Sequence, residues 1–205
     1  MNDWISIGIS FVALAVSVTT AWLTLFRRGE LRMTQPTVIF FGPDGGSRSG
    51  RQPQLKVFLR TLLYSTSRRG QTVESLHINL QRGESKQNFS IWVYGDQHLA
   101  RGSGLFVPAE GIACNHHFLL PSDGTNFRLL EGDYMLRIYA KRVDVSTAKE
   151  FMAVRLRISE SHAKALEGEN VGIYFDWGPD QQAYHPHIEK VPPKPMSALL
   201  HEERS

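Results

Sequence analysis

Two patterns of hydrophobic residues divide this chain. The first is an unbroken apolar stretch, residues 4–26, that contains no charged side chain. A helix of this length spans about 35 Å and can cross a hydrocarbon core about 30 Å thick. The second pattern, an alternation of apolar and polar residues, runs through most of the remaining chain and is typical of half-buried β-strands.

Three interpretations compete for residues 4–26. A cleaved signal peptide needs a basic N-terminal flank, a shorter apolar core and a small-residue cleavage site. This chain instead has Asp3 before the segment and the run LFRR after it. A buried core helix is usually shorter and carries a polar stripe. We therefore predict a transmembrane helix over 4–26, behind a short flank at 1–3, with a signal peptide and a core helix as the alternatives.

The residues beside this segment predict its orientation. Arg27, Arg28 and Arg32 follow the segment, and no Lys or Arg precedes it. Basic flanks stay on the cytoplasmic side and meet anionic lipid there. We expect a single-pass protein of the inner (plasma) membrane with its N-terminus outside and its C-terminal domain in the cytoplasm. The single cysteine, Cys114, excludes an internal disulfide, which agrees with a reducing compartment.

Small and weakly polar residues recur along one face of the predicted helix at spacings of four and three. They are Ser6, Ser10, Ala13, Ser17, Thr20 and Thr24. In lipid, small side chains let helices approach closely, and hydroxyls can bond across the interface. This seam predicts self-association or pairing with another membrane protein. The alternative is that the hydroxyls bond to carbonyls of their own helix.

The remaining chain predicts a mainly β fold. After a juxtamembrane linker at 27–36, residues 37–158 read as an antiparallel β-sandwich, because short alternating segments are separated by polar or Gly-rich turns. Strands are predicted at 37–41, 55–64, 76–81, 89–94, 104–107, 116–120, 134–143 and 151–158, and the last two are predicted to form a hairpin. Residues 159–190 predict a short helix and an added strand packed on the sandwich, and 191–205 a disordered tail.

The run FRLLEGDYMLRIYA at 127–140 narrows this prediction. It resembles the stretch that enters the penultimate strand of immunoglobulin-like domains, where a Tyr hydroxyl bonds to backbone upstream. The resemblance implies that role for Tyr134 and an immunoglobulin-like sandwich, although the cysteine pair of antibody domains is absent. A single helix followed by such a domain resembles small bacterial single-pass membrane proteins.

Strand alternation also predicts what the sandwich shows to solvent. If Tyr134 and Leu156 face the core, basic and aromatic side chains gather on the outer face of their sheet. These are His77, Arg137, Tyr139, Lys141, Arg155 and Arg157. Guanidinium groups beside aromatic rings suit phosphate or carboxylate ligands. The alternatives are a solvated strand face, or a face covered by residues 171–177.

The remaining motifs do not indicate a metal site, a phosphate-binding loop or a catalytic site. Cys114, His116 and His117 are possible zinc ligands, but neighbouring strand residues point to opposite faces, and the pair His185 and His187 lacks a partner motif. The Gly-rich run GPDGGSRSG lacks the GK[ST] ending of a phosphate-binding loop, and no GxSxG or HExxH motif occurs. We therefore predict no metal, no cofactor and no enzymatic activity.

Two functions are consistent with these predictions. The first is a membrane-anchored, non-enzymatic binding or scaffold module that presents its cytoplasmic domain to a protein partner. The second is a ligand-gated membrane effector, whose basic sheet face binds an anionic, nucleotide-like signal and whose transmembrane helices oligomerise. The expected partners are membrane lipid, a second copy or another membrane protein, and an anionic small ligand. The net charge of +3 does not indicate sequence-specific nucleic acid.

Overall fold

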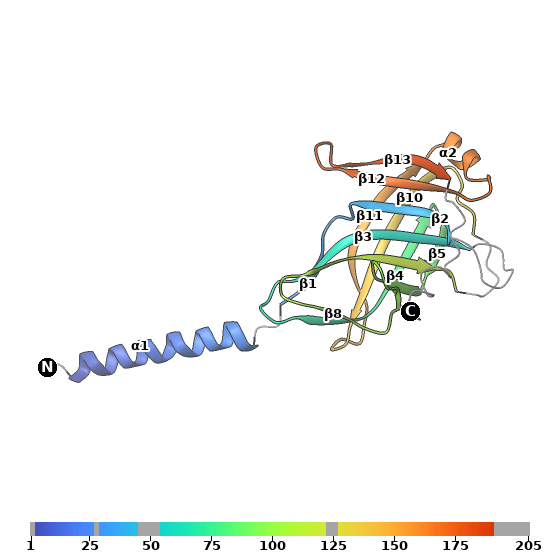
Figure 1. The fold of residues 1–205 in the computed structure, drawn as a ribbon. Helices are drawn as coiled ribbons and strands as arrows, with labels where there is room; N and C mark the ends of the chain where they lie inside the picture. Colours follow the sequence, from blue (N-terminus) through green and yellow to red (C-terminus); the bar gives the residue numbers. More distant parts are fainter. Residues whose placement is uncertain (1–2, 27–28, 45–53, 122–126, 191–205) are drawn as a thin grey trace.

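An N-terminal helix and a β-rich domain make up the computed structural model, which describes residues 3–26, 29–44, 54–121 and 127–190. Helix α1 (Asp3–Ala21) and a turn of π-helix, η1 (Trp22–Phe26), project from the domain (Figure 1). The predicted mainly β, antiparallel fold is confirmed. The predicted tail, the 1–2 part of the flank, the 27–28 part of the linker and most of the Gly-rich run lie outside the described residues, so those predictions stay open.

Helix α1 has no part of the described domain packed on it. The apolar span Trp4–Thr24 is 0% buried, and its large side chains, among them Phe11 and Trp22, are exposed. A core helix of this domain would bury one face, so the core-helix alternative is wrong. By length and composition the helix fits a membrane span, and it also fits a signal sequence.

Two antiparallel sheets form the domain within the described residues. In the larger sheet the order is β13-β12-β2-β3-β9-β6-β7, and β1 pairs with β3. Its strands are β1 (Leu31–Met33), β2 (Val38–Pro43), β3 (Leu55–Ser65), β6 (Ile91–Tyr94), β7 (Ala100–Arg101), β9 (Ile112–Leu119), β12 (Val171–Gly178) and β13 (Ala183–Lys190).

The smaller sheet has the order β11-β10-β4-β5, and β8 pairs with β4. Its strands are β4 (Gln71–Arg82), β5 (Ser85–Phe89), β8 (Leu105–Val107), β10 (Gly132–Arg142) and β11 (Lys149–Ile158). Every pairing in both sheets is antiparallel, and β10 and β11 form the predicted hairpin. Helix α2 (Glu160–Ala165) follows β11, and Ser159 caps it by accepting a hydrogen bond from the backbone N–H of His162.

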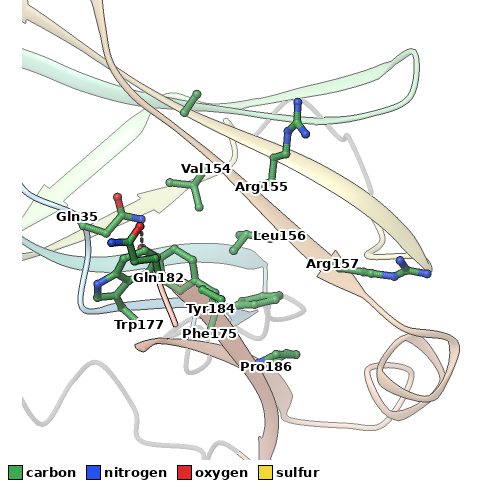
Figure 2. A pocket seen from close by; sticks show the side chains of 12 residues that line it. Gln35, Val154, Arg155, Leu156, Arg157, Phe175, Trp177, Gln182, Tyr184 and Pro186 are labelled. Atoms are coloured by element: carbon green, nitrogen blue, oxygen red, sulfur yellow. Dashed lines mark hydrogen bonds between the residues drawn. The ribbon is translucent and has the colours of Figure 1, made fainter. Parts of the chain in front are cut away.

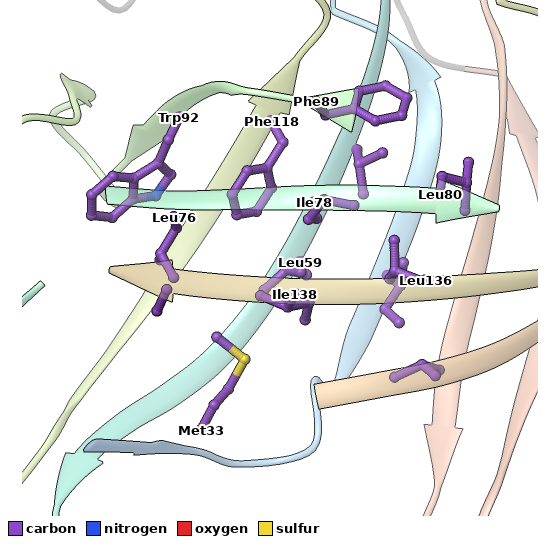
Figure 3. Packing of buried hydrophobic residues seen from close by; sticks show 14 of the residues in the cluster. Met33, Leu59, Leu76, Ile78, Leu80, Phe89, Trp92, Phe118, Leu136 and Ile138 are labelled. Atoms are coloured by element: carbon purple, nitrogen blue, oxygen red, sulfur yellow. The ribbon is translucent and has the colours of Figure 1, made fainter. Parts of the chain in front are cut away.

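Alternate residues of the two sheets meet in one hydrophobic core (Figure 3). Leu59 and Phe118 come from the larger sheet, and Ile78, Leu136 and Ile138 come from the smaller one, all fully buried. The period of two along each strand places these side chains on the inner face and leaves their neighbours outside. The packing of this core therefore determines which side chains of each strand face solvent.

Tyr134 has the hydrogen bonds of a tyrosine corner. Its hydroxyl donates to the carbonyl oxygen of Leu130 at 2.7 Å and accepts the Leu130 N–H at 2.8 Å, while its ring is buried. Gly132, between the two residues, has a φ of 141°, which glycine adopts more readily than other residues. This contact was implied by the resemblance; the immunoglobulin-like assignment of the whole sandwich stays a prediction.

The segment predicted as one strand at 89–94 is two strands in different sheets. The chain breaks pairing at Ser90, so Phe89 ends β5 in the smaller sheet and Ile91 begins β6 in the larger one. The break changes the phase of the alternation, because Trp92 is buried whereas Ile91 and Val93 are only half-buried. The prediction of one continuous strand over 89–94 was therefore wrong.

The sheets also extend beyond the predicted limits of the sandwich. Residues 31–33, assigned to the linker by the sequence, form β1 on β3. The extension at 159–190 contains two strands, β12 and β13, that continue the larger sheet from β2. Strand β13 gave little sequence signal, because most of its residues are exposed and Pro186 interrupts its pattern.

Removal of the Tyr134 hydroxyl tests the corner. We expect Tyr134→Phe to lower the free energy of unfolding by about 1–2 kcal/mol, since two backbone groups of Leu130 lose their partner. Urea denaturation of the full chain in detergent measures the change. Tyr139→Phe is the matched control: its hydroxyl meets the partly exposed carboxylate of Glu150 at 3.2 Å, and we expect less than about 0.5 kcal/mol. Equal losses in both variants would contradict the assigned role.

Candidate functional site

The six residues predicted to bind an anion lie on the outer face of the smaller sheet, in two groups. The registers place Tyr139 opposite His77 on β4, and Met135 opposite Arg155 on β11. The first group lies toward the end of β10. It consists of His77, Arg137, Tyr139 and Lys141. The second group lies beside the start of β10 and consists of Arg155 and Arg157.

The cations of the first group already have partners. Lys141 Nζ lies 2.7 Å from Glu74 Oε1, and Arg137 Nε lies 3.7 Å from Glu150 Oε2. The ring of Tyr139 stacks on His77 at a centroid distance of 5.0 Å. Desolvation lowers the pKa of His77 and so favours its neutral form. An incoming anion must displace these carboxylates, so this half of the face offers little free positive charge.

The second group lies at a groove. Arg155 and Arg157 are exposed on β11, and with the β12–β13 hairpin they line a space of about 480 Å³ (Figure 2). In the described part of the chain, β11 is the last strand of the smaller sheet and β13 the last strand of the larger one. The groove therefore opens where the two sheets part.

Aromatic side chains on β12 and β13 form one wall of the groove. Tyr184 packs on Trp177 at a centroid distance of 5.1 Å, and Phe175 is buried beneath them. The Tyr184 hydroxyl donates to the carbonyl oxygen of Pro36 at 2.8 Å and accepts from Gln35 Nε2 at 3.0 Å. Burial raises the pKa of Tyr184 well above its ordinary value, so the phenol stays protonated. These bonds hold the wall in one orientation.

The groove combines apolar walls with cations at its edge. Leu156 and Val154 reach it from the inner side of β11, while Arg155 and Arg157 reach it from the outer side. Such a site can bury apolar side chains of a ligand and pair with its carboxylates. The sequence indicated the two arginines but missed the contribution of Tyr184, since β13 was not predicted as a strand.

Strand β12 does not cover the predicted face. Its residues 173–176 pair with β2 in the larger sheet, so the segment 171–177 belongs to the opposite layer and approaches β11 only at the groove. The covered-face alternative is therefore wrong. The outer face of β10 and β11 is open to solvent within the described residues.

The paired histidines on β9 have different surroundings. His116 is buried: its Nδ1 accepts a hydrogen bond from Trp92 Nε1 at 3.1 Å, and its Nε2 lies 3.4 Å from the Cys114 sulfur. His117 faces the other side and packs on Phe58. Desolvation lowers the pKa of both histidines to about 4, and burial raises that of Cys114 to about 11. No three His, Cys, Asp or Glu side chains of the described residues converge as metal ligands.

The hydroxyls of the helix seam bond to their own helix. Ser10 Oγ donates to the Ser6 carbonyl at 2.9 Å, and Ser17 Oγ donates to the Ala13 carbonyl at 2.8 Å. Thr24 bonds to Thr20 in the same way. The back-bonding that the sequence left as an alternative is thus present. Such bonds leave the small face accessible, and helix association stays a prediction.

No protein-family model and no curated protein matches the chain. One solved structure with a match is a family 123 glycoside hydrolase from Clostridium perfringens, at a TM-score of 0.35 and 8% sequence identity. The match covers 64% of this chain and 27% of that protein, so the chain spans about a quarter of its length. At this TM-score the likeness carries no argument about activity.

The buried His116 predicts a loss of stability in acid. Between about pH 6.5 and pH 4 the unfolded chain binds a proton at this residue that the folded chain does not, so the free energy of unfolding falls as pH falls. We expect His116 to contribute a loss of about 2 kcal/mol between about pH 7 and pH 5. Urea denaturation of the full chain at several pH values measures it.

A pair of variants separates this effect from general acid sensitivity. His116→Gln should reduce the pH dependence, since a Gln oxygen can accept the Trp92 hydrogen bond without titrating. His98→Gln, at an exposed position, should keep it. An unchanged pH dependence in His116→Gln would show that this histidine is not the titrating group.

Proposed function

We propose that this protein is a membrane-anchored, non-enzymatic binding module that presents the groove between β11 and the β12–β13 hairpin to an extended segment of a partner protein. The observation that carries the proposal is the groove itself, which has rigid aromatic and apolar walls, two arginines at its edge and strand edges on both sides.

The N-terminal helix supports the membrane anchorage. Its span Trp4–Thr24 is apolar and unburied, and a helix of this kind is stable in lipid because its backbone groups bond internally. The basic residues after it favour a cytoplasmic domain. Anchorage raises the effective concentration of the groove near membrane-bound partners, which allows a modest affinity to suffice.

The open strand edges support an extended ligand. An edge strand carries backbone N–H and C=O groups with no neighbour, and a peptide can pair with them as an added strand while its side chains enter adjacent pockets. Pro186 lacks an N–H and makes β13 the poorer template, so β11 is the favoured edge. Arg155 and Arg157 then select acidic side chains of the partner.

The lining of the groove supports a binding role over a catalytic one. Its residues include no Asp, Glu, His, Cys, Ser or Lys among those described. General acid–base and nucleophilic catalysis both need such groups within hydrogen-bond reach of the substrate. The buried Cys114 and His116 lie in the core, and burial keeps the Cys114 thiol protonated.

A ligand-gated effector remains the second candidate. It is supported by Arg155 and Arg157, whose cations are exposed at a common edge. The effector function is less favoured because Arg137 and Lys141, two cations of the predicted anion-binding face, already pair with carboxylates. A nucleotide bound in the groove, instead of a protein segment, would favour it.

Photo-crosslinking inside cells tests the proposed groove. We expect a benzoylphenylalanine in place of Ala183, which lines the groove, to form an adduct between the full-length protein and a partner. The same probe in place of Lys86, exposed on β5, is the matched control and should give none. Mass spectrometry of the adduct distinguishes another protein from a second copy of this chain.

Charge reversal makes this test specific. Arg155→Glu with Arg157→Glu should reduce the Ala183 adduct at least about fivefold, because acidic side chains of the partner are then repelled. Lys86→Glu should leave it unchanged. An adduct that survives the arginine reversal, or one that forms equally at both probe positions, would contradict the proposed site.

A further inference from the structure

The chain enters the domain through two tightly held residues, Gly29 and Glu30. The Gly29 carbonyl accepts hydrogen bonds from Gln71 Nε2 at 2.9 Å and Arg142 Nη1 at 3.4 Å. The backbone of Glu30 bonds to Thr66 in both directions, at 2.7 and 2.9 Å. A Cβ at Gly29 would lie 2.4 Å from the Ser67 backbone nitrogen, so a larger residue cannot take this position without a shift of the chain.

Because these bonds hold Gly29 and Glu30 on the domain, only a short stretch of chain connects the helix to it. The helix ends at Phe26, and only three peptide steps lead to Gly29. Three steps span at most about 11 Å. If the helix crosses a membrane, the end of the domain that holds Gly29 must lie at the headgroup layer. Figure 1 shows α1 leaving the domain on the side where β1 and β8 lie.

Exposed hydrophobic side chains gather near this end. Phe106 on β8 is 61% exposed and Val143, after β10, is 63% exposed; in the described domain the other large exposed hydrophobic is Leu130. Phe106 and Val143 both lie beside Thr72. Thr72 is the register partner of Phe106, and the Thr72 carbonyl accepts a hydrogen bond from the Val143 N–H at 3.2 Å. The Phe106 ring lies against Gly70.

Two basic residues continue the same surface. Arg68 and Arg69 lie on the turn between β3 and β4, next to Gly70, and both are exposed. The hydroxyls of Ser65 and Ser67 hold this turn by donating to the Arg69 carbonyl, each at 3.0 Å. Neither arginine side chain has a hydrogen-bond or ion-pair partner in the described part of the chain. The same turn holds Glu30, so the arginines stand beside the point where the chain arrives from the helix.

We propose that Phe106, Val143, Arg68 and Arg69 form a lipid-docking surface that holds the domain against anionic headgroups of the cytoplasmic leaflet. This inference rests on the proposed membrane anchorage. An aromatic ring beside exposed guanidinium groups suits the boundary between acyl chains and phosphates, where the ring enters the apolar layer and the arginines pair with lipid phosphate. Docking leaves the β12–β13 hairpin, on the opposite side of the domain from β8 in Figure 1, free to meet a partner.

A spin label at Thr72→Cys measures docking, in full-length protein with Cys114→Ser, reconstituted in lipid nanodiscs. Collision rates with lipid-soluble oxygen and with an aqueous nickel complex report its depth. We expect the label to be shielded from nickel in nanodiscs that contain phosphatidylserine, and exposed in nanodiscs of phosphatidylcholine alone. The matched control is a label at Ser85→Cys, near the far end of the same sheet, where Arg82 pairs with Ser85. This label should stay aqueous in both.

Substitution of the arginines tests their role. Arg68→Gln with Arg69→Gln should lower the ratio of docked to undocked domain about 25-fold, since each basic residue near an anionic surface contributes about fivefold. Phe106→Gln, a second variant at an exposed position, should also release the domain. Each variant is compared with the parent by thermal unfolding, so that loss of fold is separated from loss of docking.

The outcomes distinguish docking from anchorage. Equal depth of the labels at Thr72 and Ser85 in phosphatidylserine nanodiscs overturns the docking surface while the helix remains inserted. Equal docking in both lipids, or unchanged docking after the arginine substitutions, overturns the role given to anionic headgroups. A protein that does not co-elute with nanodiscs, or that alkaline carbonate extracts from membranes, overturns the anchorage instead.

Discussion

The hydrophobic layer between the two sheets is the interaction on which the rest of the structure depends. Its residues alternate along the strands of two unequal sheets, which have eight and five strands in the described part of the chain. The larger sheet continues from β2 through β12 to β13, whereas the smaller sheet ends at β11 in the described residues. The aromatic side chains of β12 and β13 therefore line a groove beside β11. The groove at Arg155 and Arg157 follows from this difference in strand number.

The same fold also fixes the point where the chain enters the domain. Strand β1 pairs with the end of β3, and the turn after β3 holds Glu30, so the entry point of the chain is part of the folded domain. A helix that ends at Phe26 then gives the domain only a short connection. In the proposed arrangement, the end bearing Phe106 and Arg68 faces lipid, and the groove faces the cytoplasm.

The features that depend on local patterns could be predicted from the sequence. The alternation around Leu136 and Val154 placed β10 and β11 as a hairpin. The resemblance around Tyr134 implied a bond from its hydroxyl to upstream backbone, and in the structure the partner is Leu130. Features that depend on pairing between distant segments could not be predicted in this way. Strand β13 has few apolar residues and is recognisable only beside β12, so the wall formed by Tyr184 could not be inferred. The ion pairs of Arg137 and Lys141 with carboxylates likewise depend on strand registers, which the spacing of residues in the sequence does not reveal.

The proposed binding role depends most on the N-terminal helix being retained in the membrane with the domain inside the cell. Mass spectrometry of the protein purified from membranes, combined with protease added to intact cells and to opened ones, measures this most directly. We predict a mass that includes the apolar helix 4–26, and a β domain cleaved only after the cells are opened. A mature chain that begins after this segment, or a domain digested from outside intact cells, would contradict the account.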